Sequence, residues 1–191
     1  VNEAVDFAEL VGARVYCSSF TEVNFPMNHP QFHGGVGIGS RDAREKLSKG
    51  DVVVAVGVLS TYGQLSSSPE MLLLDLDPTF IHIDVDPTEI GKIQPTDVGM
   101  ISDPKVSLRE IVEALDAEMT ALSKEAAKGR VVKLSAEKEL ATESWNQLVK
   151  SKWNTNPMSD IRMVSELAAS LPDDTVIIGD ANTTRTAINN V

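Results

Sequence analysis

Two carboxylates stand at the end of an apolar strand pattern, where their type and spacing suit the binding of hydroxyl groups. Residues 80–86 read FIHIDVD, so apolar and polar residues alternate until the run closes with Asp84 and Asp86. Pro87 then stops the strand and is expected to begin a short helix, because proline fits the first helical position. Doubly wound α/β folds bind ribose and other hydroxyls at the carboxyl end of a strand. Asp84 and Asp86 therefore predict a ligand crevice.

A glycine-rich segment offers a second binding element. Residues 34–40 read GGVGIGS, with Gly37 at the centre, and they lie in a long predicted loop over residues 18–39. Long loops at strand ends usually carry function, and glycine lets the main chain approach a ligand closely. Gly37 together with Asp84 and Asp86 would then form a nucleotide site. The alternative is that these glycines only provide turn geometry before a helix.

The elements that must position these residues alternate between helix and strand. Helical spacing predicts helices over residues 2–11, 40–47 and from 104 onward; apolar runs predict strands over residues 15–17, 51–56, 80–86 and 97–101. The continuous run VVVAV within residues 51–56 indicates a strand buried on both faces. Alternating elements favour an α/β fold with an open parallel sheet flanked by helices, Rossmann-like in architecture.

The last third of the chain predicts a different organisation. Residues 123–156 are rich in charge and carry a helical pattern, which indicates a connector. From Pro157 onward a helix is expected to reach residue 171, followed by a strand over residues 175–178 and a short final helix. A partial second α/β unit is therefore predicted after the connector.

Three segments carry a family resemblance. IHIDVDPTEIGK at residues 81–92, FPMNHPQF at residues 25–32 and GDVVVAVG at residues 50–57 resemble, in order and spacing, the central domain of thiamine-diphosphate-dependent enzymes. That family includes acetolactate synthases and the benzoylformate and pyruvate decarboxylases. Residues 159–180 are similar to the start of the family's C-terminal, diphosphate-binding domain. The resemblance implies a central domain at residues 1–122 without the family's first strand, a connector at 123–156, and a truncated C-terminal domain at 157–191.

The resemblance also implies roles for single residues. His29 matches, in its Phe-Pro-x-x-His-Pro setting, a histidine that serves proton transfer in benzoylformate decarboxylase, and an imidazole that titrates near neutrality suits that task. The alternative is a structural His-Pro pair. His33 and His82 are better explained as a loop donor and a sheet residue.

Asn182, Thr183 and Thr184 resemble the loop that touches the cofactor's diphosphate in benzoylformate-decarboxylase-like members. Hydroxyl and main-chain donors near a helix N-terminus suit an anion. The alternative is that Thr183 or Thr184 only caps the last helix.

The resemblance places the cofactors, thiamine diphosphate and Mg²⁺, in the full-length enzyme. Gly179-Asp180-Ala181 departs from the family's metal motif, and Mg²⁺ needs an octahedral set of oxygens, so no metal site is expected in this chain. Residues 58–63 depart from the segment found in flavin-binding acetolactate synthases, which argues against FAD. No cofactor is expected to bind firmly to this fragment alone.

Two function classes follow. The first is a fragment of a thiamine-diphosphate-dependent 2-oxo-acid decarboxylase or carboligase, benzoylformate decarboxylase-like, in which this central domain is mainly structural and inactive alone. The second is a nucleotide-binding (ADP or FAD) or structural interaction module of the same fold. The resemblance implies a 2-oxo acid as the substrate of the full enzyme and a homo-oligomer as its assembly.

Composition limits the partners and the compartment. The 191 residues carry a net charge of −11, which argues against nucleic acid and against an anionic membrane surface. No run of about 18 apolar residues predicts a membrane span. Cys17, the single cysteine, excludes an internal disulfide and favours a buried strand thiol in a reducing compartment. We therefore expect a cytoplasmic protein.

Overall fold

The computed structural model describes residues 1–18, 24–37, 40–58, 77–92, 94–172, 174–177 and 183–188. Contacts divide the chain into two compact units, Val1–Ser135 and Ala136–Val191. Each unit is described by itself.

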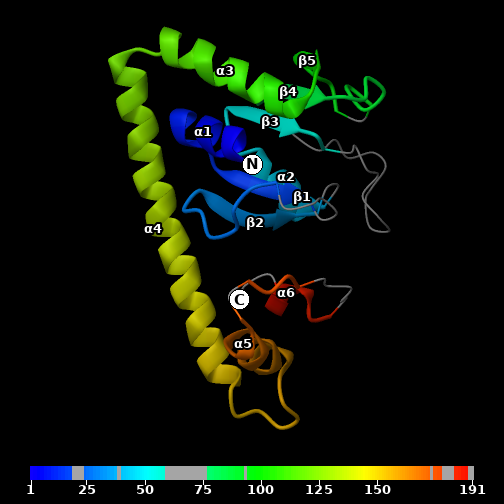
Figure 1. Ribbon diagram of the computed structural model, residues 1–191, viewed down its shortest axis with the longest axis vertical. Helices are drawn as coiled ribbons and strands as arrows, with labels where there is room; N and C mark the ends of the chain where they lie inside the picture. The colour runs from blue at the N-terminus through cyan, green and yellow to red at the C-terminus, as the bar shows by residue number, and fades with distance from the viewer. Residues whose placement is uncertain are drawn as a thin grey trace. The chain divides into compact units, whose positions relative to one another are not determined.

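The first unit combines helices and strands (Figure 1). In chain order its elements are α1 (Asn2–Val11), β1 (Val15–Ser18), β2 (Phe32–Val36), α2 (Arg41–Leu47), β3 (Val52–Val56), β4 (Thr79–Asp84), β5 (Val98–Ile101) and α3 (Pro104–Glu118). Helix α4 (Ala121–Lys152) begins in this unit and ends in the second. Helices α1 and α3 pack against each other.

The strands form two parallel sheets. Strands β1 and β2 pair with each other, and β3, β4 and β5 form a three-stranded sheet in that order. The strand arrows of both sheets run the same way in Figure 1, so their carboxyl ends share one side of the unit. Parallel sheets with helices beside them confirm the predicted α/β class.

Local hydrogen bonds set the ends of the predicted helices. Gly12 ends α1 in the left-handed conformation (φ 63°), where its N–H bonds back to carbonyls of the last turn. Ser40 caps α2, since its hydroxyl accepts from the main-chain nitrogen of Ala43 at 3.1 Å. Asp103 caps α3 in the same way, directly before Pro104.

Strand β2 corrects the predicted loop over residues 18–39. Phe32 pairs with Val15, and Val36 pairs with Ser18, in a parallel ladder with one irregularity. Phe32 and Val36 are both buried. Cross-strand pairing therefore holds this Gly-containing segment in a strand, against its low intrinsic preference for that state.

Two further expectations in the first unit are wrong. Residues 87–91 form turns rather than a helix, with the Glu89 nitrogen donating to the carbonyl of Asp86 at 3.1 Å. Strand β3 is not buried on both faces, because Val52 is 48% exposed and its other residues are half-buried. Among the described strands β3 pairs only with β4, which leaves one of its edges without a ladder.

In the second unit, α5 (Asp160–Ser170) begins after Ser159, whose hydroxyl accepts from the Arg162 nitrogen at 3.2 Å. A short helix, α6 (Arg185–Ile188), follows near the end. The strand predicted over residues 175–178 is wrong for the described residues 175–177, which form no strand; Val176 is 83% exposed. No described strand lies in this unit to pair with them.

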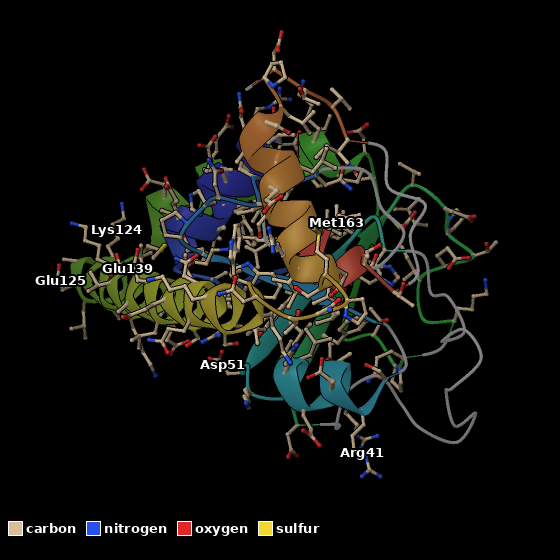
Figure 2. The ribbon with its side chains drawn as sticks, turned by 90° about the horizontal axis from the view of Figure 1, so that it is seen from below. Arg41, Asp51, Lys124, Glu125, Glu139 and Met163 are labelled. Atoms are coloured by element: carbon tan, nitrogen blue, oxygen red, sulfur yellow. The ribbon has the colours of Figure 1, made fainter. Side chains whose placement is uncertain are left out.

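Charged side chains stand along α4, as Lys124, Glu125 and Glu139 show in Figure 2. Among the described helices, none combines the length and the apolar character that crossing a membrane requires.

Candidate functional site

His29 sits in a rigid pair of turns directly before β2. Its nitrogen donates to the carbonyl of Pro26 at 3.1 Å, and its carbonyl accepts from the nitrogen of Phe32 at 2.9 Å. Pro30 lies at the second position of the later turn, where its fixed φ favours the turn conformation. The main chain at His29 is therefore held from both sides.

Both ring nitrogens of His29 have partners. Nδ1 lies 3.2 Å from the main-chain nitrogen of Gln31, which donates to it. Nε2 lies 3.2 Å from Oε1 of Glu9, on α1. The ring of Phe25 meets the imidazole edge-on, with centroids 5.1 Å apart and planes at 78°. The imidazole is thus fixed in position and in plane, with 14% of its side chain exposed.

Gln31 fastens this turn to the end of α1. Its side chain is fully buried, and Nε2 donates to the carbonyl oxygens of Ala8 and Ala13, at 2.7 Å each. Ala8 lies in the last turn of α1, where its carbonyl also accepts from the Ala13 nitrogen at 2.9 Å, and Ala13 follows the helix. Gln31 was not predicted as a site residue, because its role depends on carbonyl groups at positions 8 and 13.

The aromatic residues on either side of His29 belong to the core of the unit. Phe25 and Phe32 stack at 6.5 Å and are buried with Ala8, while Val15 and Cys17 pack against them. Burial raises the pKa of the Cys17 thiol. The His29 turn is therefore anchored in the hydrophobic core.

Strand β4 ends at Asp84, two residues earlier than predicted, and Asp84 is buried. Its Oδ1 accepts from the nitrogen of Asp86 at 2.9 Å. Its Oδ2 lies 4.0 Å from Nε2 of His82, too far for a hydrogen bond, and that buried nitrogen has no hydrogen-bond partner. A buried carboxylate oxygen and a buried imidazole nitrogen thus face each other at the carboxyl end of the sheet.

Asp86 is already committed to its own turn. Its Oδ1 accepts from the hydroxyl of Thr88 at 2.7 Å and from the Thr88 nitrogen at 2.8 Å. The hydrogen bond from the Thr88 hydroxyl, with that from its nitrogen, lowers the pKa of the Asp86 carboxyl. Each carboxylate therefore has one oxygen engaged in this turn, and of the two Asp84 is buried whereas Asp86 is exposed.

Gly37 follows β2 and is exposed. Its carbonyl accepts from the nitrogen of Ser40 at 2.9 Å, which places it in the turn that leads into α2. Gly37 is not among the described glycines with positive φ, unlike Gly34 within β2. The turn role left open by the sequence therefore has direct geometric support.

The predicted site residues of the first unit form two groups. Gly37, Asp84 and Asp86 lie at the carboxyl ends of the strands, whereas His29 precedes β2 at the amino end (Figure 1). His33, within β2, has its Nδ1 3.2 Å from a guanidinium nitrogen of Arg14. The structure does not bring His29 together with the two carboxylates.

The predicted diphosphate-contacting residues belong to the second unit. Asn182 lies outside the described residues. Thr183 is exposed, while the half-buried Thr184 precedes α6, and its carbonyl accepts from the Ile188 nitrogen at 3.0 Å. Thr184 thus holds the capping position of this four-residue helix.

A metal–diphosphate group requires several oxygen ligands together. In the described ranges, no three or more His, Cys, Asp or Glu side chains gather in a way that would hold a metal ion. The described residues therefore do not fit the metal part of such a group.

The parallel strands and their neighbouring helices define an α/β fold of the Rossmann type, with Asp84 at the carboxyl end of β4. Residues 1–111 match the family described as thiamine pyrophosphate enzyme, central domain. The chain belongs to this family.

Several known proteins are similar in sequence to this chain. A Bacillus subtilis protein described as thiamine pyrophosphate-containing, YdaP, is 28% identical over 183 residues, covering 95% of this chain and 29% of its own. Sulfoacetaldehyde acetyltransferase of Roseovarius nubinhibens is 27% identical, and the match covers 92% of this chain and 31% of that protein. The acetolactate synthase isozyme 3 large subunit of Escherichia coli is 30% identical, and the match covers 58% of this chain and 19% of that subunit.

Among solved structures, a thiamin diphosphate-dependent enzyme from Mycobacterium smegmatis matches 59% of this chain and 21% of its own, with 24% identity and a TM-score of 0.49. The chain spans less than a third of the length of each of these relatives.

Proposed function

We propose that this chain is the central part of a thiamine-diphosphate- and Mg²⁺-dependent enzyme that acts on a 2-oxo acid as a decarboxylase or carboligase, of the benzoylformate decarboxylase type. Membership of the thiamine pyrophosphate enzyme family supports the cofactor. A cytoplasmic homo-oligomer belongs to the same proposal, as does the lack of nucleic-acid and membrane binding, which the net charge of −11 supports.

The observation that carries the benzoylformate decarboxylase type is the setting of His29. Its motif, FPMNHP, holds the imidazole on a rigid double turn, which is the preorganisation that a catalytic group needs. Nδ1 is engaged by the main chain of Gln31, so Nε2 is the nitrogen that serves a substrate. Its present partner, Glu9, has a side chain that is 58% exposed and free to exchange.

The role assigned to this chain is limited to its own residues. The described residues do not fit the metal part of the cofactor site, so in this proposal they do not hold the metal ion. In this proposal the central domain is mainly structural and contributes His29, and the 191-residue chain alone is inactive.

The test is turnover of a panel of 2-oxo acids by the complete enzyme that contains this chain, with thiamine diphosphate and Mg²⁺. Replacement of His29 by Ala is expected to lower kcat/KM for the best substrate by roughly 100-fold. The matched control is Asn28→Ala, at the exposed neighbouring position, which is expected to leave kcat/KM unchanged. No turnover of any 2-oxo acid, or equal effects of the two variants, would refute the proposal.

A second candidate function is nucleotide binding at the carboxyl edge, supported by the buried Asp84 facing His82. A ribose hydroxyl could bond to Oδ2 of Asp84, since carboxylates at this position of α/β folds hold ribose. Calorimetric titration of the chain with ADP, with FAD, and with thiamine diphosphate plus Mg²⁺ tests this candidate. Micromolar ADP or FAD binding that is lost in Asp84→Asn and kept in the exposed control Asp51→Asn would establish it; no binding would leave the domain architectural.

A further inference from the structure

The hydrogen bonds around His29 determine which ring nitrogen carries its proton. A main-chain N–H is a donor at every pH, so Nδ1, which accepts from the Gln31 nitrogen at 3.2 Å, must offer a lone pair. The proton of the neutral ring is then on Nε2. Glu9 agrees with this assignment, because its carboxylate accepts at 3.2 Å from Nε2 and has no proton to give when ionised.

The donor to Nδ1 is itself fixed. Gln31 is fully buried and anchored by two 2.7 Å bonds to the end of α1, so its main-chain nitrogen cannot turn away without breaking them. Glu9 lies on that same helix, one residue after Ala8. One helix end therefore positions both partners of the imidazole.

We infer that Glu9 and Gln31 are positioning residues that hold His29 as its Nε2–H tautomer, so that His29 acts on a substrate as a neutral hydrogen-bond donor to oxygen and not as a base. This inference rests on the proposed function, in which His29 touches the substrate. A donor held in place before the reaction stabilises negative charge that develops on a carbonyl or carboxylate oxygen. The exposed Glu9 carboxylate holds the position that such an oxygen would take.

The first test is nitrogen-15 NMR of the imidazole in the labelled 191-residue chain, at a pH where His29 is neutral. The expected spectrum has a pyrrole-like Nε2 and a pyridine-like Nδ1. In Glu9→Ala the same tautomer should persist, because the Gln31 nitrogen remains, while the Nε2 proton should exchange with water severalfold faster. Asp6→Asn is the control, since it removes one charge from the exposed face of the same helix. A proton on Nδ1, or averaging of both nitrogens, would overturn the inference.

The second test separates donation from base catalysis in the complete enzyme. In His29→Gln the side-chain NH₂ occupies the position of Nε2–H, so a donor remains there. In His29→Asn the shorter amide occupies the position of Nδ1, so the donor at the Nε2 position is lost. A donor role predicts that His29→Gln keeps kcat/KM within about tenfold, while His29→Asn and His29→Ala lose roughly 100-fold. Equal losses in all three would overturn the donor role. If none of the three changes kcat/KM while the NMR tautomer is as expected, the proposed catalytic use of His29 fails and its positioning stands.

Discussion

Gly12 lies directly against the main chain of Ala127. A Cβ built on Gly12 would stand 2.5 Å from the Ala127 carbonyl oxygen, closer than real Cβ contacts come. Arg130, one turn further along α4, donates to the Val11 carbonyl at 2.7 Å. The end of α1 that carries Glu9 and receives Gln31 is thus held by α4 as well, so a change at Gly12 tests how firmly the His29 turn is supported.

We expect Gly12→Ala to lower the free energy of unfolding by about 2 kcal/mol, because φ +63° disfavours any side chain and the methyl group would strike main-chain atoms. Urea unfolding followed by circular dichroism measures the change. The matched control is Gly129→Ala, in α4, where an added Cβ meets nothing within 4 Å. It should raise the free energy of unfolding by about 1 kcal/mol, since alanine favours a helix over glycine. Equal effects of the two changes would contradict the close packing at Gly12.

Thr88→Val removes the hydroxyl that donates to Asp86 at 2.7 Å while keeping the size of the side chain. The pKa of Asp86, which the two Thr88 hydrogen bonds lower, should rise toward its ordinary value of 3.8. Because the pKa of Asp86 is lower in the folded chain than in the unfolded chain, these hydrogen bonds stabilise the fold at pH values above the unfolded pKa. That stabilisation is lost as the pH falls through the folded pKa. Titration of the Asp86 carboxyl by NMR measures the change. Thr96→Val, whose hydroxyl bonds a carbonyl instead, should leave the pKa of Asp86 where it was.

The features that the sequence predicted correctly are those determined by neighbouring residues. The helices predicted over residues 2–11, 40–47 and from 104 onward are confirmed, because Gly12, Ser40 and Asp103 bond to main chain within a few residues of themselves. The apolar alternation of residues 80–84 likewise indicated β4 without knowledge of its partners. These are local physical causes, and a single sequence contains them.

The features that the sequence missed depend on distant partners. Strand β2 exists through its ladder with β1, and Gln31 matters through carbonyls at positions 8 and 13, neither of which a local pattern reveals. The same holds within the candidate site. Spacing placed Asp84 and Asp86 at a strand end, but only the structure distinguishes the buried Asp84 from Asp86, whose oxygen Thr88 already occupies.

Cys17 is expected to react slowly with thiol reagents. Burial raises the pKa of its thiol above the ordinary value of 9.0, so less thiolate is present at pH 8 than in a free cysteine, and the thiolate is the reactive form. The rate of reaction with Ellman's reagent at pH 8 should be at least about tenfold below that of the same chain unfolded in urea. A rate equal to that of the unfolded chain would show that β1 does not shield the thiol.

In the second unit, Arg162 joins α5 to the end of α4. Its Nη1 donates to the carbonyl of Trp153 at 3.0 Å, its guanidinium lies 5.4 Å from the centre of that indole ring, and its Nε donates to Glu166 at 2.8 Å. Lysine keeps the charge but lacks the planar group that makes these three contacts together. Arg162→Lys should therefore destabilise this unit by about 1 kcal/mol.

Trp153 fluorescence, read during urea unfolding in a Trp145→Phe background, measures the free energy of unfolding at the indole that Arg162 contacts. Glu166→Gln is the matched control, because it alters only the ion pair with Glu166, whose side chain is 46% exposed. Partly exposed ion pairs of this kind contribute little, so its effect should stay within about 0.5 kcal/mol. If the two variants shift the transition equally, the ion pair carries the stability; if only Arg162→Lys does, the contacts with Trp153 hold α5 against the end of α4.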